Sequence, residues 1–129
     1  MPGVIAMEIQ SFFSYDTTNA EIEILNEQLF TETENLKEVA LIIVCDDNEF
    51  TSKNLRNFLW VTFTRCNPSH DIYGIESFYD HKHWGCKGPL IIDARIKPHH
   101  APVLEKDVNS EKKIEKIFNK GGSLYNVLK

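Results

Sequence analysis

Val39-Ala40-Leu41-Ile42-Ile43-Val44 (VALIIV, residues 39–44) is the stretch that decides the fold of this 129-residue chain. A strand that is apolar at every position is typical of the centre of a parallel sheet, because helices then cover both of its faces. The polar residues Cys45-Asp46-Asp47-Asn48 follow directly. They are expected at the carboxyl edge of the sheet, where ligands of open α/β folds tend to bind.

The chain before this strand predicts one further strand and one helix. Gly3 to Ile9 is mostly apolar and is interpreted as a strand buried on both faces. Thr18 is expected to cap a helix, with Glu21 completing a capping box three residues later. One face of this helix carries Ile22, Leu25 and Leu29. Polar residues 31–35 are interpreted as the loop that leads into the central strand.

The chain after this strand predicts a second helix. We expect Thr51 or Ser52 to cap it and Asn67-Pro68 to end it just after Arg65. Four apolar residues are predicted to share one face of this helix, namely Leu55, Phe58, Leu59 and Phe63. Trp60 and Val61 are predicted to point elsewhere. A helix that is apolar nearly all round is buried on more than one side. It is therefore expected to meet a second layer or another subunit.

The remaining elements complete an α/β pattern. Residues 71–78 and 90–92 are predicted as strands, joined by a loop over residues 79–89. A last helix is expected after a cap at Asn109 or Ser110, with Gly121 as a left-handed stop. Its inward side chains are predicted to be Ile114, Ile117 and Phe118. The order predicts a small single domain, residues 1–129, with a mixed, largely parallel sheet flanked by helices.

Composition narrows the class of protein. A formal net charge of -5 argues against nucleic acid as a partner, because phosphate binding needs a clustered basic surface. The lysines between residues 112 and 120 alternate with glutamates and are interpreted as a solvated helix face. The longest apolar run is too short for a membrane span, and no signal peptide is recognised. A cytoplasmic location is predicted, with the three cysteines as free thiols.

Residues 58–100 hold both tryptophans, all five histidines and two of the three cysteines, so most of any site is expected there. Imidazole and thiolate are the ligands that zinc or copper prefers. The candidate ligands are His81, His83 and Cys86, with His99 and His100 as a further pair and Asp93 as a neighbour that could complete a shell. Their spacing matches no strong zinc template, which favours surface or interface histidines over a metal site.

Other chemistries find weaker support in the sequence. Cys86 beside a histidine suggests a nucleophile, and Lys87 a desolvated amine, but the orienting group and oxyanion pocket are not identified. Asp46-Asp47 resembles the acidic pocket of a receiver domain, yet no aspartate ends the third predicted strand, so a turn or a helix cap is favoured. Residues 85–88 lack the strand-to-helix context of a phosphate loop.

Several segments together resemble one known family. Residues 57–68 (NFLWVTFTRCNP), followed by Asp71, look like a family helix that runs through tryptophan to Thr-Arg, then a proline and an aspartate. Gly85-Cys86-Lys87 and Ile92-Asp93-Ala94 look like its Gly-Ser-Lys and Asp-Ala-Thr segments, and residues 41–47 like its central strand. The family is UbiD, the polyprenyl-hydroxybenzoate carboxy-lyases and related decarboxylases. Residues 91–102 with 121–124 look closest to its menaquinone-type members.

The resemblance implies that this chain is the C-terminal domain of a longer decarboxylase. The short lead-in before the first predicted strand also suggests a domain cut from a longer polypeptide. Family members decarboxylate aromatic or α,β-unsaturated acids with prenylated flavin mononucleotide and a divalent metal, manganese or magnesium. Those groups and the catalytic residues belong to an upstream flavin-binding domain, so no catalytic, cofactor-binding or metal residue is assigned here. A homo-oligomer, dimer or higher, and a role in quinone biosynthesis are also implied.

By the same resemblance, the C-terminal domain helps to shape the substrate pocket. The substrate-facing candidates are Tyr79, His81, His83, Trp84, Cys86 and Lys87, with Trp84 as an apolar wall. Cys86 stands where the family usually has serine and Arg95 where it has threonine, and Gly88-Pro89 lengthen the loop. Two alternatives stay open, a free-standing module that binds metal through its His and Cys residues and an assembly module without a site.

Overall fold

The computed structural model describes residues 2–31, 36–100 and 107–125. Its elements in chain order are β1 (Val4–Glu8), α1 (Tyr15–Thr31), β2 (Leu41–Cys45), α2 (Asn48–Ser52), α3 (Leu55–Arg65), β3 (Ile72–Gly74), β4 (Ser77–Asp80), β5 (His83–Cys86), β6 (Leu90–Asp93) and α4 (Val108–Phe118). The expected loop over residues 31–35 falls mostly outside the described residues, as do residues 101 and 102 of the resemblance.

A mixed, mostly parallel four-stranded sheet forms the core, in the order β1-β2-β6-β3. β1 and β6 both run parallel to β2, and only β3 is antiparallel to its neighbour. In the register, Ile43 stands beside Ala6 on one strand and Ile92 on the other. The predicted α/β class is confirmed, and the aliphatic run lies at the centre of the sheet as expected.

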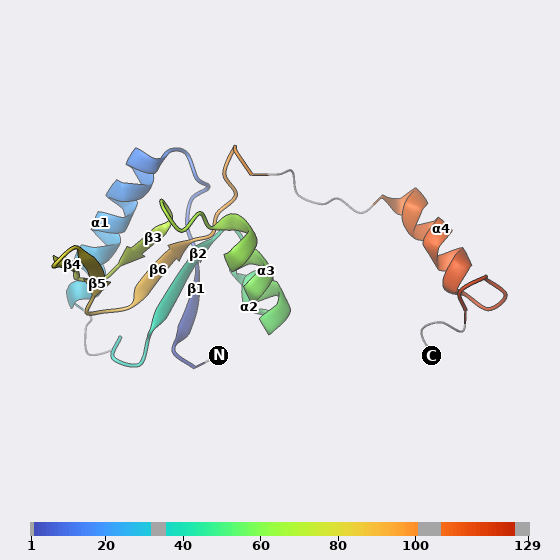
Figure 1. Cartoon of the computed structure of the whole chain (residues 1–129), viewed down its shortest axis with the longest axis horizontal. Helices are drawn as coiled ribbons and strands as arrows, with labels where there is room; N and C mark the ends of the chain where they lie inside the picture. The colour runs from blue at the N-terminus through green and yellow to red at the C-terminus, as the bar shows by residue number, and fades with distance from the viewer. Residues whose placement is uncertain (1, 32–35, 101–106, 126–129) are drawn as a thin grey trace.

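Helices cover both faces of the sheet, with α1 on one side and α2 and α3 on the other (Figure 1). On the α1 side, Ile22 packs with Ile42, Val44, Ile75 and Ile91. On the α3 side the buried cluster is Ile43, Cys45, Phe58, Val61 and Ala94. Successive residues of β2 therefore point into different clusters, which explains why every position of this strand is apolar.

Two of the strand predictions are wrong. β1 is an edge strand of the sheet and is only partly buried, whereas burial on both faces was expected. Residues 71–78 form two separate strands, and the expected loop over residues 79–89 contains the antiparallel hairpin β4–β5. His81 and Lys82 both have positive φ in its turn, at 47° and 69°. Asn-Gly or Asp-Gly usually fills such a turn, so its sequence gave little sign of a hairpin.

The helix boundaries also differ from the prediction. Ser14 caps α1, because its Oγ accepts a hydrogen bond from the Thr17 amide at 3.2 Å, and the helix begins three residues before Thr18. The second predicted helix is two helices, α2 capped by Asp47 and α3 capped by Asn54. Asn54 has an extended backbone, and its Oδ1 accepts from the Asn57 amide at 2.9 Å. An extended residue interrupts the helical hydrogen bonds, which separates α2 from α3.

Helix α3 and helix α4 bury less of their surface than expected. Phe58, Val61 and Thr62 of α3 are buried, whereas Leu55, Leu59 and Phe63 are exposed. α4 is capped by Asp107 and has no buried residue, so the prediction of an inward apolar face is wrong. Figure 1 shows α4 standing apart from the sheet. Gly121 has φ of 94°, as a left-handed stop requires.

In the described ranges, the structure has no helix that is both long and apolar enough to cross a membrane.

Candidate functional site

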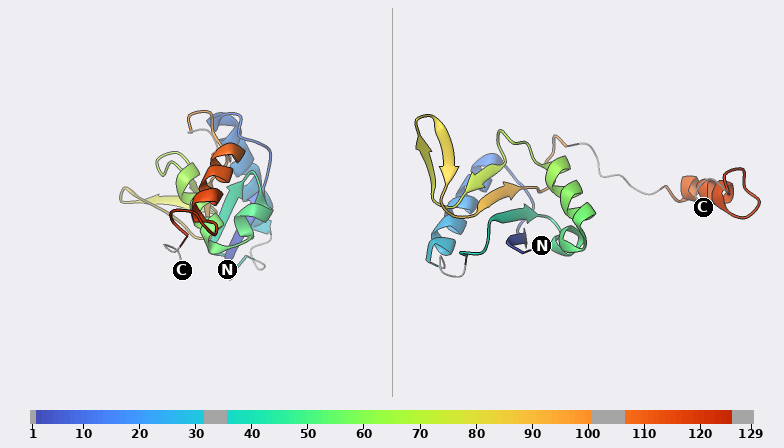
Figure 2. Two further views of the ribbon diagram at one scale, coloured as in Figure 1. Left: turned by 90° about the vertical axis from the view of Figure 1, so that its right-hand side faces the viewer. Right: turned by 60° about the horizontal axis from the view of Figure 1, so that its bottom comes forward.

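The predicted substrate-facing residues lie on the β4–β5 hairpin, which projects from the sheet (right-hand view of Figure 2). The hairpin follows β3 and precedes β6, so it stands at the edge opposite the carboxyl ends of the parallel strands. Tyr79 pairs with Trp84, and Ser77 with Cys86, and all four side chains share one face of the hairpin. The opposite face carries Phe78 and His83. The hairpin therefore divides the predicted residues between two surfaces.

Trp84 and Cys86 pack toward the sheet over Gly74. A Cβ atom added at Gly74 would lie 2.8 Å from the Cys86 Sγ and 3.2 Å from the Trp84 Cη2. Tyr79 on the same face stays 80% exposed, against 38% for Trp84. The hairpin thus presents the Trp84 ring, which packs against Gly74, beside the exposed ring of Tyr79. Both are available as an apolar wall for a flat ligand.

The histidines do not assemble into a metal site. His83 and Cys86 lie on opposite faces of the hairpin, and His81 in the turn is exposed and bonded to Asp80, with 2.6 Å between Nδ1 and Oδ1. Within residues 2–31, 36–100 and 107–125, no three His, Cys, Asp or Glu side chains come together as potential metal ligands. Strand alternation separates residues that the sequence places only a few positions apart.

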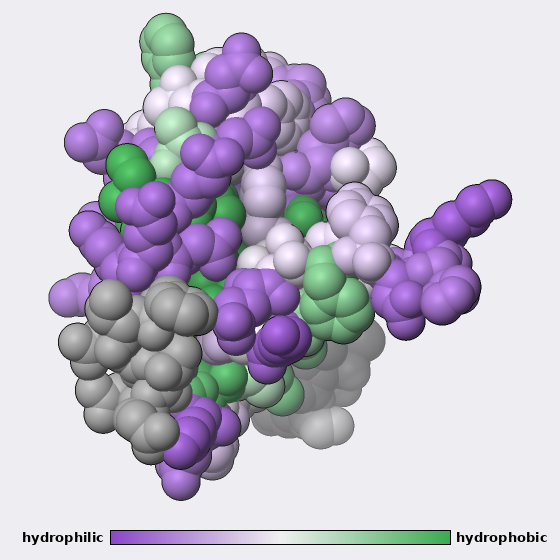
Figure 3. Space-filling model, turned by 90° about the vertical axis from the view of Figure 1, so that its left-hand side faces the viewer, coloured by the Kyte–Doolittle hydropathy of each residue, from purple (hydrophilic) through white to green (hydrophobic). Residues whose placement is uncertain are grey.

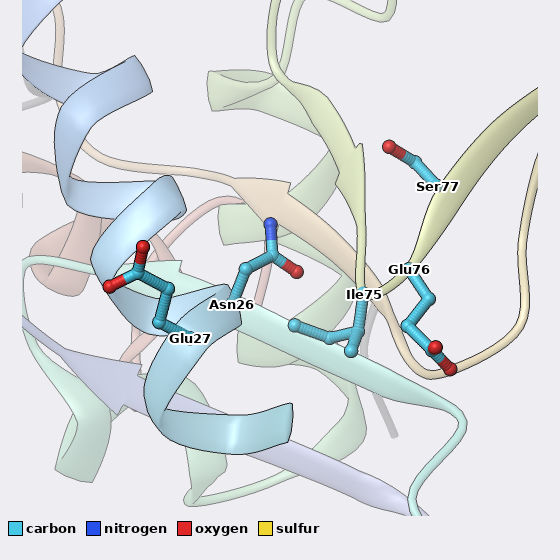
Figure 4. Close-up of a pocket in the computed structure, with 5 residues that line it drawn as sticks. All are labelled: Asn26, Glu27, Ile75, Glu76 and Ser77. Carbon is cyan, nitrogen blue, oxygen red and sulfur yellow. The ribbon is translucent and has the colours of Figure 1, made fainter. Parts of the chain in front are cut away.

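A hollow of about 380 Å³ lies beside the hairpin, between α1 and the junction of β3 with β4. Figure 4 shows Asn26 and Ile75 pointing toward each other across it, while Glu27 and Glu76 stand at its sides. The Asn26 Oδ1 is buried without a hydrogen-bond donor in the described structure. Figure 3, which views the molecule from the side of α1, shows a mostly polar surface with apolar areas broken into separate spots.

Buried charges occupy the opposite, carboxyl edge of the sheet. Lys97 is fully buried, and its Nζ lies 3.4 Å from the Asp71 Oδ1 and 3.7 Å from the Asp93 Oδ1. The same ammonium donates to the backbone carbonyls of Asp93, Arg95 and Arg65 at 2.9, 3.3 and 3.4 Å. A buried charge is tolerated only when it is paired and hydrogen-bonded, and Lys97 meets both conditions.

Arg95 extends this charge cluster toward α1. Its guanidinium binds both Asp93 carboxylate oxygens, at 3.0 and 2.9 Å, and also Glu21 and Thr18, each at 2.9 Å. A fifth bond, of 2.8 Å, reaches the Gln10 carbonyl. Burial lowers the pKa of Arg95, but the bonds to Asp93 and Glu21 outweigh burial and raise it overall. Arg95 therefore ties β6, α1 and the segment after β1 together as a permanent cation.

The acidic pair after β2 has structural partners. The Asp46 Oδ2 accepts from the Ile96 amide at 2.7 Å and lies 3.4 Å from Arg65. The Asp47 Oδ1 accepts from the Phe50 amide at 2.8 Å and caps α2. The interpretation of these residues as a turn and a helix cap is confirmed.

An aromatic and histidine rim lies above the buried charges. The Tyr15 ring is 5.4 Å from His70 and 6.5 Å from His99, and the rings of His99 and His100 are 4.7 Å apart. Burial, reinforced by the negative charge of Asp71, raises the pKa of the Tyr15 hydroxyl. The five histidines are therefore split between the two edges of the sheet, three at the carboxyl edge and two on the hairpin.

The sequence prediction did not single out Arg95 and Lys97 as buried residues. The available signal was the alternation Asp93-Ala94-Arg95-Ile96-Lys97 directly after a buried strand, which places three charged residues on one side. The structure leaves these charges no access to solvent. A fully buried and fully paired lysine has no free position for a substrate, so the cluster acts in folding. The hairpin and the adjacent hollow remain the accessible candidate site.

Comparison with known proteins places the chain near decarboxylases. No family model matches the sequence. A 4-hydroxybenzoate decarboxylase subunit of Chlamydia pneumoniae is 33% identical over 85 residues, which cover 66% of this chain and 15% of that protein. The chain is related to a decarboxylase subunit. An uncharacterised protein of Chlamydia muridarum is 27% identical over 99 residues, or 77% of this chain and 17% of that protein.

Among solved structures, the vanillic acid decarboxylase of Sedimentibacter hydroxybenzoicus in open form is similar, with a TM-score of 0.48 and 16% identity. That comparison covers 98% of this chain and 26% of the decarboxylase chain. In the sequence comparisons, the matched segment is less than a fifth of the curated relatives' length. The sequence similarity supports the relationship to UbiD-like decarboxylases that the motifs indicated.

Proposed function

We propose that this chain is the C-terminal, non-catalytic domain of a UbiD-like carboxy-lyase that acts on an aromatic or unsaturated carboxylic acid, in quinone biosynthesis of the menaquinone type. The observation that supports this best is the 33% identity to a 4-hydroxybenzoate decarboxylase subunit over 85 residues. The complete enzyme would carry an upstream flavin-binding domain in the same polypeptide and would form a homo-oligomer. Its location is proposed to be cytoplasmic.

The divalent metal of that enzyme does not fit the residues described in this chain. A divalent metal needs a group of oxygen or nitrogen ligands, and the buried carboxylates Asp71 and Asp93 are already paired with Lys97 and Arg95. No other group of three potential ligands forms within the described ranges. Prenylated flavin mononucleotide and its manganese or magnesium ion are assigned, in this proposal, to the upstream domain.

The role proposed for this chain is to close the substrate pocket with the β4–β5 hairpin. Trp84 is fixed over Gly74 and Tyr79 is exposed beside it, so the hairpin offers a flat apolar surface of the kind that lines small-molecule sites. His81 in the turn and Lys87 after β5 are exposed near this surface and supply hydrogen-bond donors for a carboxylate, whereas His83 is exposed on the opposite face of the hairpin.

A graft tests the proposal directly. The aligned segment of the Chlamydia pneumoniae decarboxylase is replaced by the corresponding residues of this chain, and release of carbon dioxide from 4-hydroxybenzoate is measured. The parent protein and a variant lacking the segment serve as references. We expect the graft to restore activity that the deletion abolishes. A folded graft that is as inactive as the deletion, beside an active parent, would show that this domain does not perform the proposed role.

The hairpin is then tested within the active graft. Trp84→Ala is expected to lower kcat/KM by about tenfold or more, the loss typical for a well-packed aromatic contact. Trp60→Ala is the matched control, because Trp60 is 39% exposed, against 38% for Trp84, and lies on α3 away from the hairpin. Equal kinetics for the two variants would remove Trp84 from the substrate pocket.

A further inference from the structure

Strand β1 leaves one edge of the main sheet open. It stands at the end of the strand order, and within the described ranges only β2 pairs with it. Its sequence has no proline and no charge before Glu8, and its register with β2 has no bulge. Proteins usually protect an edge strand with such features, because unpaired backbone groups bind other strands. The unprotected edge of β1 is therefore a candidate binding surface.

Alternate residues of β1 direct their backbone groups to this open edge. The Gly3 carbonyl accepts from the first amide of β2 at 3.1 Å, and the Met7 carbonyl accepts from the thiol at the end of β2 at 3.7 Å. Both carbonyls therefore face β2. Because the backbone groups of successive residues alternate between the two edges of a strand, Val4, Ala6 and Glu8 direct their N–H and C=O groups outward.

A hollow lies on each face of the sheet beside this edge. On the α1 face it measures about 570 Å³, and its mainly apolar lining includes Met7, Ile24 and Leu25. On the other face a smaller hollow of about 170 Å³ is lined by Val4 and Ala6 together with apolar and polar residues of α2 and α3. The side chains of an added strand would alternate between the two hollows. Large apolar side chains fit the α1 face, and small or polar ones fit the other.

The charges around the edge select the kind of strand. α1 carries no basic residue and three exposed acidic residues, namely Asp16, Glu23 and Glu27. Two copies paired edge to edge through β1 would place their α1 helices on the same face, where these like charges repel. Lys53 and Arg56 lie on the opposite face, next to α3 and within it. Basic residues of an added strand are therefore favoured on the α1 face.

We propose that the open edge of β1 binds an extended segment of another protein as an added strand. This segment has large apolar residues at every second position, with lysine or arginine on the same face and small or polar residues between them. Backbone hydrogen bonds to Val4, Ala6 and Glu8 supply affinity, and the two hollows supply specificity for the alternating side chains. The inference rests on β1 and its surroundings and does not depend on the decarboxylase assignment.

Amide hydrogen exchange of the purified 129-residue chain shows whether the edge is open. The Ala6 amide is expected to exchange at least about tenfold faster than the Met7 amide, which pairs with β2. Protection of Ala6 in the chain alone would overturn the proposal. Protection that is independent of protein concentration would mean that the chain covers its own edge, and protection that rises with concentration would mean that a second copy does.

The probe for binding is the peptide acetyl-Lys-Thr-Leu-Thr-Leu-Thr-Lys-amide, which places lysine and leucine on one face and threonine on the other. It should slow exchange of the Ala6 amide by about tenfold or more and leave the Met7 amide unchanged. Two N-methylated forms test backbone pairing, one methylated at the leucines and one at the threonines. Because only alternate amides of a strand face its neighbour, one form should bind and the other should not. Equal behaviour of the two forms would refute strand addition.

A matched pair of variants tests the hollow beside α1. Ile24→Lys should weaken peptide binding by about tenfold or more, because it removes an apolar contact and adds a charge like those of the peptide. Ile114→Lys is the control, since Ile114 is 54% exposed on α4, against 55% for Ile24. It should bind as the natural chain does. Equal losses in the two variants, or no saturable binding by the natural chain at about 1 mM peptide, would overturn the proposal.

Discussion

Replacing Lys97 by methionine should destabilise the fold strongly. The substitution removes the ammonium while keeping an unbranched side chain of similar length. The Asp71 Oδ1 has no hydrogen bond in the described structure, and its charged partner there is Lys97 at 3.4 Å. The variant therefore leaves a carboxylate that is 0% exposed without a cation. Asp93 is less affected, because Arg95 still binds both of its carboxylate oxygens.

The expected loss is about 3–5 kcal/mol in the free energy of unfolding, the usual cost of removing one partner from a buried ion pair. With a urea dependence of about 2 kcal/mol per molar for a chain of this size, the unfolding midpoint should fall by roughly 1.5–2.5 M. Lys87→Met is the matched control, because Lys87 is exposed on the segment after β5. Its free energy of unfolding should change by less than about 0.5 kcal/mol.

Urea unfolding followed by far-ultraviolet circular dichroism measures both variants. A double variant, Asp71→Asn with Lys97→Met, removes both charges while the residue 71 side chain keeps an oxygen for the Asn67 amide, which Asp71 binds at 2.6 Å. It should lose less than the sum of the single variants, by about 0.5–3 kcal/mol. A loss below about 1 kcal/mol in the free energy of unfolding for Lys97→Met would refute the reasoning, because removing one partner from a buried ion pair costs more than that.

Three further predictions concern titration and reactivity. Burial, with the nearby Lys97 charge, lowers the pKa of His100. On acidification the unfolded chain therefore binds a proton before the folded chain does, and the free energy of unfolding should fall as pH drops below about 6.5. His100→Asn keeps an acceptor for the Lys97 amide, and it should make the urea midpoint less dependent on pH between about pH 7.5 and 5. Burial raises the pKa of Tyr73 to about 12. The free energy of unfolding should therefore fall above about pH 10, where Tyr73 of the unfolded chain ionises, and Tyr73→Phe should reduce that fall. An unchanged dependence of stability on pH in this variant would contradict the raised pKa of Tyr73. Burial also raises the pKa of the Cys45 thiol, which should react with a disulfide reagent only after unfolding.

The predictions that succeeded rest on local pattern. The aliphatic run at residues 39–44 specified a central parallel strand because its neighbours on both faces had to be apolar, and the structure places clusters on both sides of it. Asp46-Asp47 was interpreted as a turn or a helix cap, and the Asp47 carboxylate does cap α2, although Thr51 or Ser52 had been expected as the cap of that helix. Such features depend on residues close in sequence, so the sequence alone reveals them.

The predictions that failed depend on distant parts of the chain. Nothing local distinguishes an edge strand from a central one, so the position of β1 followed only from the pairing order. The β4–β5 hairpin was missed because its turn uses His81 and Lys82 at positive φ rather than Asn-Gly. Helical spacing identified the apolar stripe of α4, but not whether the chain itself would cover it.

The sequence by itself determined the α/β class, the central strand and the relationship to decarboxylases, because strand periodicity and motif spacing are properties of neighbouring residues. Only the tertiary structure decided that Arg95 and Lys97 are buried with Asp71 and Asp93, and that the histidines divide between opposite edges of the sheet. Burial and pairing of charges are set by segments up to 85 residues apart, as the bond from Arg95 to the Gln10 carbonyl shows. No local pattern contains that information, because the energy of a charge depends on what the fold places around it.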